Sequence, residues 1–209
     1  MLFRSVLGYS AFGTGVILLS LAVGSILASG AGGALGAKRG PVFVVQLGIF
    51  LELLGVAGIA LIISPTTKVI LIIIPLFIYG LGVGLATAQL TGVALSQIPV
   101  EKSGQASGMT STTRQIGSAL GIAILGTVLF ASFGATLRAA VPDQRISSAI
   151  VNSAGGAIEA LSRDPKNNYI VEQSKEALTQ GSRTSAYVAS AFLLIGWFAT
   201  RSLSRKESR

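Results

Sequence analysis

Two ionisable side chains, Glu52 and Arg114, stand inside long apolar stretches of this sequence, where a charge is costly. A carboxyl group there can take up and release a proton, whereas a guanidinium stays charged and needs a partner or water. Two interpretations of Glu52 remain open: a proton-relay or coupling group, or a protonated carboxyl that donates one interhelical hydrogen bond. No nucleophile–base pair, phosphate-binding loop or metal-ligand set accompanies them, and His and Cys are absent. We therefore expect no enzyme, no metal and no cofactor.

The composition is that of a membrane protein. Of the 209 residues, 51% are hydrophobic and 11% are charged, whereas about a quarter of the residues in a soluble domain are charged. The mean hydropathy is +0.71. A net charge of +8 would suggest nucleic acid in a polar chain, but here the basic residues gather at ends and loops. Basic residues in those places set membrane orientation, so the expected partner is the lipid bilayer and not nucleic acid.

Arg114 belongs to the most informative stretch, residues 103–133, which is long enough to cross a bilayer and rich in small residues. At 100° per residue, a set of small and polar side chains falls within an arc of about 140°. We call this set the stripe below: Thr110, Thr113, Arg114, Gly117, Ser118 and Gly121. Helices in lipid associate through small residues and hydrogen bonds. The stripe is therefore predicted to face protein or a water-filled cavity, with Gly117 and Gly121 as packing glycines.

The sequence predicts five transmembrane helices in all. Residues 13–36, 41–63, 69–98 and 184–200 join residues 103–133 as the expected spans. Between the last two spans the charge is mixed, and short amphipathic helices are expected there, against the bilayer surface. The expected organisation is a four-span bundle over 1–131, an extracytoplasmic loop over 132–183, the last span over 184–200 and a basic cytoplasmic tail over 201–209.

The third expected span carries a second set of small residues along one face. These are Gly80, Gly84, Thr87, Thr91 and Ala94, with Gln89 on the opposite side and Tyr79 between the two. Gly80 and Gly84 are predicted to allow close helix packing. A helix of this kind is expected to be buried on more than one side. Both a cavity-lining helix and a central packing helix fit the pattern.

An odd number of spans places the two termini on opposite sides of the membrane. Lys38, Arg39 and Lys102 share a side with the basic tail, and the positive-inside rule puts that side in the cytoplasm. The N-terminus and residues 132–183 are then expected outside. Glu52 and Arg114 would each lie eleven residues above a cytoplasmic helix end. Our hypothesis is that they lie at equal depth, within reach of each other, and partly neutralise.

Several motifs in this chain resemble the major facilitator superfamily, and in particular the C-terminal part of its fourteen-span drug/proton antiporters. The most specific is the run from Gly104 to Gly126, with G-x-A-S-G followed by T-R-Q-I-G-x-A-L-G. The turn with Lys38, Arg39 and Gly40 looks like a weak second copy of the family's cytoplasmic L-x-D-R-x-G-R loop, with Ala37 in place of the Asp. The resemblance implies an all-α membrane protein, a partial C-terminal helix bundle with five of fourteen spans.

The same resemblance implies positions and a function. The third span would line the central cavity, the first and fourth would form the interface between the halves of the transporter, and the second and fifth would be peripheral. Tyr79, Thr87, Gln89 and Thr91 would border the path of an amphipathic substrate that is exchanged for protons across a bacterial cytoplasmic membrane. The partner would be the missing N-terminal helices or another chain, so the chain is expected to be inactive alone. The alternative is a stand-alone five-span scaffold or assembly partner that transports nothing.

Overall fold

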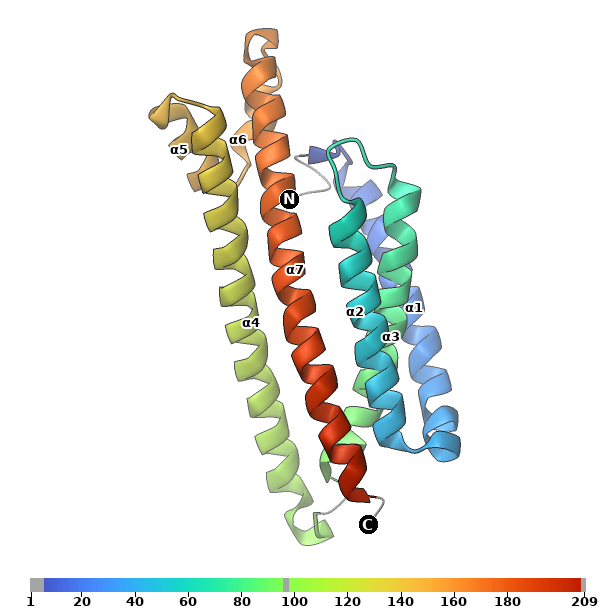
Figure 1. The fold of residues 1–209 in the computed structure, drawn as a ribbon. Coiled ribbons are helices and arrows are strands. Elements are labelled where there is room, and N and C mark those ends of the chain that lie inside the picture. The colour runs from blue at the N-terminus through green and yellow to red at the C-terminus, as the bar shows by residue number, and fades with distance from the viewer. Residues whose placement is uncertain (1–5, 96–97, 208–209) are drawn as a thin grey trace.

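The computed structural model describes residues 6–95 and 98–207, which fold into helices joined by short connections (Figure 1). The helices are α1 (Ala11–Arg39), α2 (Pro41–Ile62), α3 (Val69–Leu95), α4 (Ser103–Ala140), α5 (Gln144–Asn152), α6 (Ala157–Leu161) and α7 (Asn168–Glu207), with 3-10 turns at Val100–Lys102 and Pro165–Asn167. The all-α prediction is confirmed. By length and composition, α1 to α4 could each cross a membrane. The less apolar α7 is not among these candidates, so a span over 184–200 stays a prediction.

Helix α3 lies between α1 and α2 and packs along both, so it is buried on more than one side as predicted. Glycines allow the main chains to approach closely. A methyl group added at Gly82 would lie 2.5 Å from the Gly48 carbonyl oxygen of α2, and one added at Gly80 would collide with the main chain of Leu21 on α1. Since only glycine tolerates this spacing, these three helices form one tightly interlocked unit.

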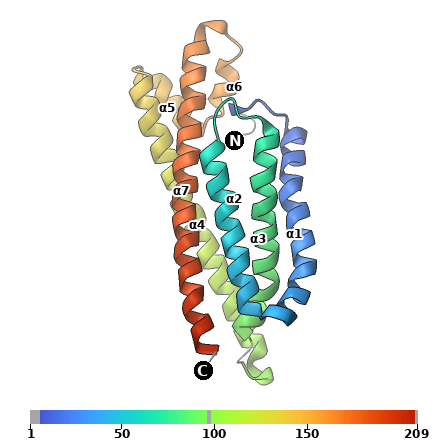
Figure 2. The ribbon, with the colours of Figure 1, turned by 45° about the vertical axis from the view of Figure 1, so that its right-hand side comes forward.

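Helix α7 lies between α4 and α2 (Figures 1 and 2). It packs on the second half of α4: the Ser185 hydroxyl donates a hydrogen bond to the Leu125 carbonyl at 2.9 Å, and Gly181 sits against Leu129 and Phe133. Burial on α4 begins only at Phe133, since no residue from 103 to 132 is buried. Helix α4 is therefore held at one end and open along the rest.

The region predicted as a loop over 132–183 is largely helical. Helix α4 continues to Ala140 and α7 already begins at Asn168, so both helices run through the expected boundaries. We call α5, α6 and the adjoining ends of α4 and α7 the cap. It holds the largest buried apolar cluster among the described residues: Val6, Phe133, Leu137, Val141, Ile150, Ile158, Val171, Ala177 and Leu178. Short helices were expected in this segment, whereas the continuation of α4 to Ala140 and the start of α7 at Asn168 were not.

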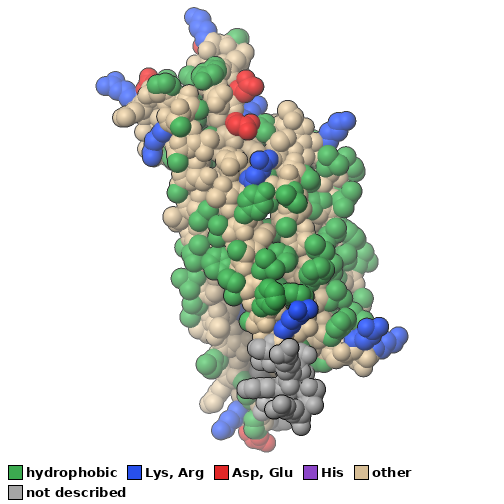
Figure 3. Space-filling view, in the orientation of Figure 1, with side chains coloured by type: hydrophobic (Ala, Val, Ile, Leu, Met, Phe, Trp, Pro, Cys, Tyr) green, Lys and Arg blue, Asp and Glu red, His purple; other side chains and the backbone are tan. Residues whose placement is uncertain are grey.

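The two ends of the molecule differ in the segments that they gather. The N-terminal segment from residue 6 lies beside the cap, whereas the α1–α2 turn, the start of α4 and the end of α7 lie at the opposite end (Figure 1). The first and last described residues thus lie at opposite ends of the molecule. Hydrophobic side chains cover the middle of the visible face, and Lys and Arg gather toward its ends (Figure 3). This is the pattern of a protein that crosses a bilayer.

Candidate transport groove

A groove of about 520 Å³ separates the middle of α4 from the rest of the bundle. Four helices line it: Val56 of α2, Tyr79 of α3, Gly117, Leu120, Gly121, Ile124 and Leu125 of α4, and Ala189, Phe192 and Leu193 of α7. Leu125 of this lining accepts a hydrogen bond from the Ser185 hydroxyl of α7. The walls of the groove are apolar, and the Tyr79 phenol contributes a side chain that can form hydrogen bonds. We call it the apolar groove.

A second groove, of about 490 Å³, lies further from the cap between α4 and the end of α3. It is lined by Leu90, Ile98, Ala106, Met109, Thr110, Thr113 and Arg114. Arg114 is the charged member of this lining, and its side chain is exposed. We call this hollow the arginine groove.

The α4 stripe accounts for both grooves. Of its six residues, Thr110, Thr113 and Arg114 line the arginine groove, and Gly117 and Gly121 line the apolar groove. Five of the six stripe residues therefore line open hollows, and the orientation of the stripe toward protein or a water-filled cavity stays a prediction. Apolar walls accommodate a hydrophobic body, while hydroxyls and a guanidinium can bind a polar end. The combination suits an amphipathic molecule of moderate size.

Glu52 and Arg114 are at different levels of the bundle. The Glu52 side chain lies against Gly82 of α3, whereas Arg114 shares its groove with Leu90. Leu90 is eight residues beyond Gly82, or about 12 Å along a helix. The equal depth predicted for the two charges is wrong, and with it the reason to expect them to neutralise each other. The cause is that α4 begins further from the cap than α2 does (Figure 1).

The four residues predicted to border a substrate path do not come together. Tyr79 lines the apolar groove. The Gln89 amide instead donates a hydrogen bond to the Gly32 carbonyl at 2.9 Å, within the contact between α1 and α3. Thr87 is exposed on α3 and lies in the lining of neither groove, and the side chain of Thr91 lies outside the described residues. Of the three whose side chains are described, Tyr79 lines a groove, and the substrate path itself stays a prediction.

The predicted packing glycines divide into two kinds. Gly80 and Gly84 lie against the main chain of α1, at Leu21 and Ser25. Gly117 and Gly121 of α4 have no heavy atom of a neighbouring residue within 4 Å of where a methyl group would be added. Packing at these two α4 positions therefore stays a prediction, because it needs a helix that the described residues do not supply.

The basic motif lies in the turn between α1 and α2. Lys38 and Arg39 form the last turn of α1, and Gly40 is the single residue between the two helices. Its φ of 86° favours glycine, and its N–H donates to the Gly36 carbonyl at 2.9 Å. The guanidinium of Arg39 lies 5.7 Å from the centroid of the Phe43 ring. Both cations are thus held at the end of the molecule opposite the cap.

Sequence reasoning missed the part that α7 plays. The resemblance implied a peripheral fifth span, but Ala189, Phe192 and Leu193 form one wall of the apolar groove. Their spacing of i, i+3 and i+4 was the available signal for a shared face. The guanidinium of Arg183 also donates a hydrogen bond to the Ile63 carbonyl at the end of α2. This contact suits the negative end of a helix dipole and fixes α7 to α2.

Comparison with known proteins gives the affiliation of the chain. Residues 1–122 match the family described as the Major Facilitator Superfamily. The multidrug resistance protein Stp of Mycobacterium tuberculosis is 33% identical over 93% of this chain and 39% of its own length. A probable actinorhodin transporter of Streptomyces coelicolor is 31% identical over 66% of this chain and 24% of its own length. No solved structure matches. The chain spans well under half the length of these relatives.

Proposed function

This chain belongs to the major facilitator superfamily, and on that premise we propose that it is the C-terminal portion of a proton-coupled efflux transporter for amphipathic compounds. The names of its relatives, a multidrug resistance protein and a probable actinorhodin transporter, support a role in moving small organic molecules. The observation that carries the proposal is the apolar groove, whose four helices surround a space of about 520 Å³. That volume is in the range of pockets that hold drug-sized molecules.

The open face of α4 supports the view that further helices complete the transporter. Secondary transporters work by rocking one bundle against another around a midplane site. This chain spans 39% of the length of its relative Stp, and no residue of α4 from 103 to 132 is buried. We propose that the missing helices cover this face, close both grooves, and are needed for activity. The end opposite the cap would be cytoplasmic, following its basic residues.

We assign proton coupling to Glu52. It is the single acidic residue within the bounds of α1 to α4, and it is half-buried against α3. Val56, one turn further along α2, lines the apolar groove. A carboxyl group beside a substrate path can couple its protonation to the occupancy of that path. A neutral amide at the same place would bind no proton.

Binding in the groove is tested with a fluorescent amphipathic dye and the purified chain in detergent. Phe192→Ala removes an aromatic wall and is expected to weaken dye binding by about tenfold or more, since burial of an aromatic ring contributes roughly 1.5–3 kcal/mol. Phe198→Ala is the matched control, because Phe198 is similarly exposed on α7 but does not line the groove. Equal loss of binding in both variants would contradict the assignment of the apolar groove.

Transport is tested in vesicles with an imposed pH gradient. The chain alone is expected to move no dye, and its co-expression with the N-terminal spans of a relative such as Stp to restore gradient-dependent efflux. In that complex Glu52→Gln is expected to abolish the dependence on the gradient, and Glu52→Asp to keep it. Efflux by the 209-residue chain alone would overturn the requirement for further helices.

The open α4 face also favours a second candidate, an assembly partner that transports nothing. In that case the chain would form a stable complex through α4 with another membrane protein. Such a complex, together with no dye binding to the groove and no efflux in any combination, would favour the scaffold over the transporter.

A further inference from the structure

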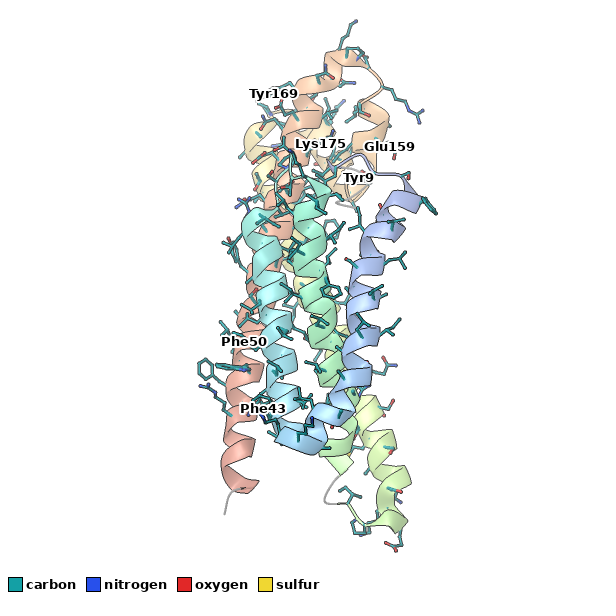
Figure 4. All side chains as sticks on the ribbon, turned by 90° about the vertical axis from the view of Figure 1, so that its right-hand side faces the viewer. Tyr9, Phe43, Phe50, Glu159, Tyr169 and Lys175 are labelled. Carbon is teal, nitrogen blue, oxygen red and sulfur yellow. The ribbon has the colours of Figure 1, made fainter. Side chains whose placement is uncertain are left out.

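A small aromatic groove lies between α2 and α7 at the end opposite the cap, away from both grooves described above. It is lined by Phe43, Gln46, Leu47, Phe50, Trp197 and Arg201. Figure 4 shows Phe43 and Phe50 on this lower part of α2. The amide of Gln46 donates a hydrogen bond to the Thr200 carbonyl at 3.1 Å, which ties the end of α7 to α2. The two walls of this groove are therefore held together by a direct bond.

The aromatic rings form a connected group on this surface. Trp197 lies 5.8 Å from Phe50 and 5.3 Å from Phe198, measured between ring centroids. Phe43, Phe50 and Phe198 all have exposed faces. Aromatic side chains at the end of an apolar span are typical of the membrane interface, where a ring meets both acyl chains and headgroups. The groove thus lies where a lipid molecule changes from apolar to polar.

The charge at this groove is positive. The Arg201 guanidinium carbon lies 4.0 Å from the centroid of the Trp197 ring, so the cation sits on the face of the indole. Contact through the face leaves the N–H groups at the edge of the guanidinium available. Arg39 extends the positive charge over Phe43, on the other wall. No acidic residue lines the groove among those that the structure describes.

We propose that this groove, with Arg201 at its mouth, binds an anionic phospholipid. The phosphate of the headgroup accepts hydrogen bonds from the Arg201 guanidinium, since planar guanidinium forks match phosphate oxygens. The first part of an acyl chain lies along Leu47 and Phe50. Basic sites between helices on the cytoplasmic side of membrane proteins suit this chemistry. The proposal does not depend on the transported substrate. A bound lipid at this groove would attach the end of α7 to the bilayer.

The chain has one tryptophan, Trp197, so the groove contains its own fluorescent probe. The full chain is reconstituted into two sets of vesicles, both half phosphatidylcholine and half phosphatidylglycerol. In one set the phosphatidylglycerol carries brominated acyl chains, and in the other the phosphatidylcholine does. Bromine quenches the fluorescence of a tryptophan that it contacts, so quenching should be stronger in the first set. The difference should correspond to about a fivefold preference for the anionic lipid, the effect of one interfacial cation. Equal quenching in the two sets would overturn the proposal.

Charge variants show which residue causes the preference for the anionic lipid. Arg201→Gln is expected to abolish it, and Arg39→Gln to reduce it by a smaller factor. Arg163→Gln, the same charge change at an exposed position in the cap, is expected to leave it unchanged. Inorganic phosphate added to the vesicles should not compete, because it lacks the acyl chain. A preference that survives in Arg201→Gln, or that falls equally in Arg163→Gln, would refute a site at Arg201. Helical content by circular dichroism checks that each variant is folded.

Discussion

Helices α3 and α4 are both rich in small residues, yet the structure uses them in opposite ways. On α3, glycines at 80, 82 and 84 would each bring an added methyl group within 2.5 Å or less of a neighbouring main chain. On α4, every glycine from 104 to 126 has open space at that point. Both helices carry several glycines, but Gly80, Gly82 and Gly84 of α3 have partners in this chain, whereas the glycines of α4 from 104 to 126 do not.

The difference shows which surfaces the chain completes by itself. Small residues stabilise membrane proteins only when another helix approaches them closely. Helix α3 meets this condition twice, with α1 and α2. Helix α4 meets it only near its end, where Gly181 of α7 contacts Leu129 and Phe133. The open half of α4 is also the half that lines both grooves, so the incomplete surface and the candidate site coincide.

The largest effect is expected where α4 is anchored. Phe133 is fully buried in the cap, and Phe133→Ala should lower the free energy of unfolding by about 3–5 kcal/mol, because it leaves a cavity in a packed core. Ile122→Ala is the control on the same helix, at a side chain that is 75% exposed. Denaturant unfolding of the chain in detergent, followed by circular dichroism, measures both. If the two variants lose similar amounts of unfolding free energy, the two halves of α4 do not differ in packing as the structure indicates.

The next effect concerns the interlocked helices. Gly80→Ala places a methyl group against the main chain of Leu21, and the helices must separate to accommodate it. Overpacking of this kind costs about 1–3 kcal/mol of unfolding free energy. The same unfolding experiment measures it. Gly15→Ala on α1, where nothing lies within 4 Å, controls for the substitution itself, and a loss there as large as at Gly80 would argue against close packing as the cause.

The sequence was sufficient for the features that depend on local pattern. Apolar length placed α1 to α4, and the single Gly40 with Pro41 at the first position of α2 placed the sharp turn between α1 and α2. The helical arc of the α4 stripe grouped five residues that line the two grooves. These features follow from periodicity and main-chain preference, which a sequence displays directly.

Other features depend on which helices meet, and a single sequence does not display that. The family resemblance placed Gln89 in a substrate path, but its amide donates a hydrogen bond to the Gly32 carbonyl on a neighbouring helix. Short helices were expected in the cap, but its shared apolar cluster forms only when α4, α5, α6 and α7 come together. The levels of Glu52 and Arg114 depended on where α4 starts relative to α2, and counting residues from two helix ends does not give that.

A smaller effect tests whether Gln89 is structural. Gln89→Leu removes the hydrogen bond to Gly32, and the unfolding free energy should fall by about 0.5–1.5 kcal/mol. Dye binding in the apolar groove should be unchanged, because Gln89 does not line it. Tyr79→Leu is the opposite case, with binding weakened. If Gln89→Leu keeps normal stability but binds dye less well, Gln89 contacts the substrate after all.

The smallest effect on folding is expected at Gly117. It is exposed, and an added methyl group meets no neighbour. Gly117→Ala should therefore leave the unfolding free energy of this chain unchanged or raise it by at most about 0.5–1 kcal/mol, the ordinary helix preference for alanine. Efflux by the complex with the N-terminal spans should nevertheless fall, because the covering helix would then meet the same collision that Gly80→Ala creates inside this chain. If efflux is normal in Gly117→Ala, the α4 glycines do not pack against a partner, and the contrast between α3 and α4 is one of lipid exposure alone.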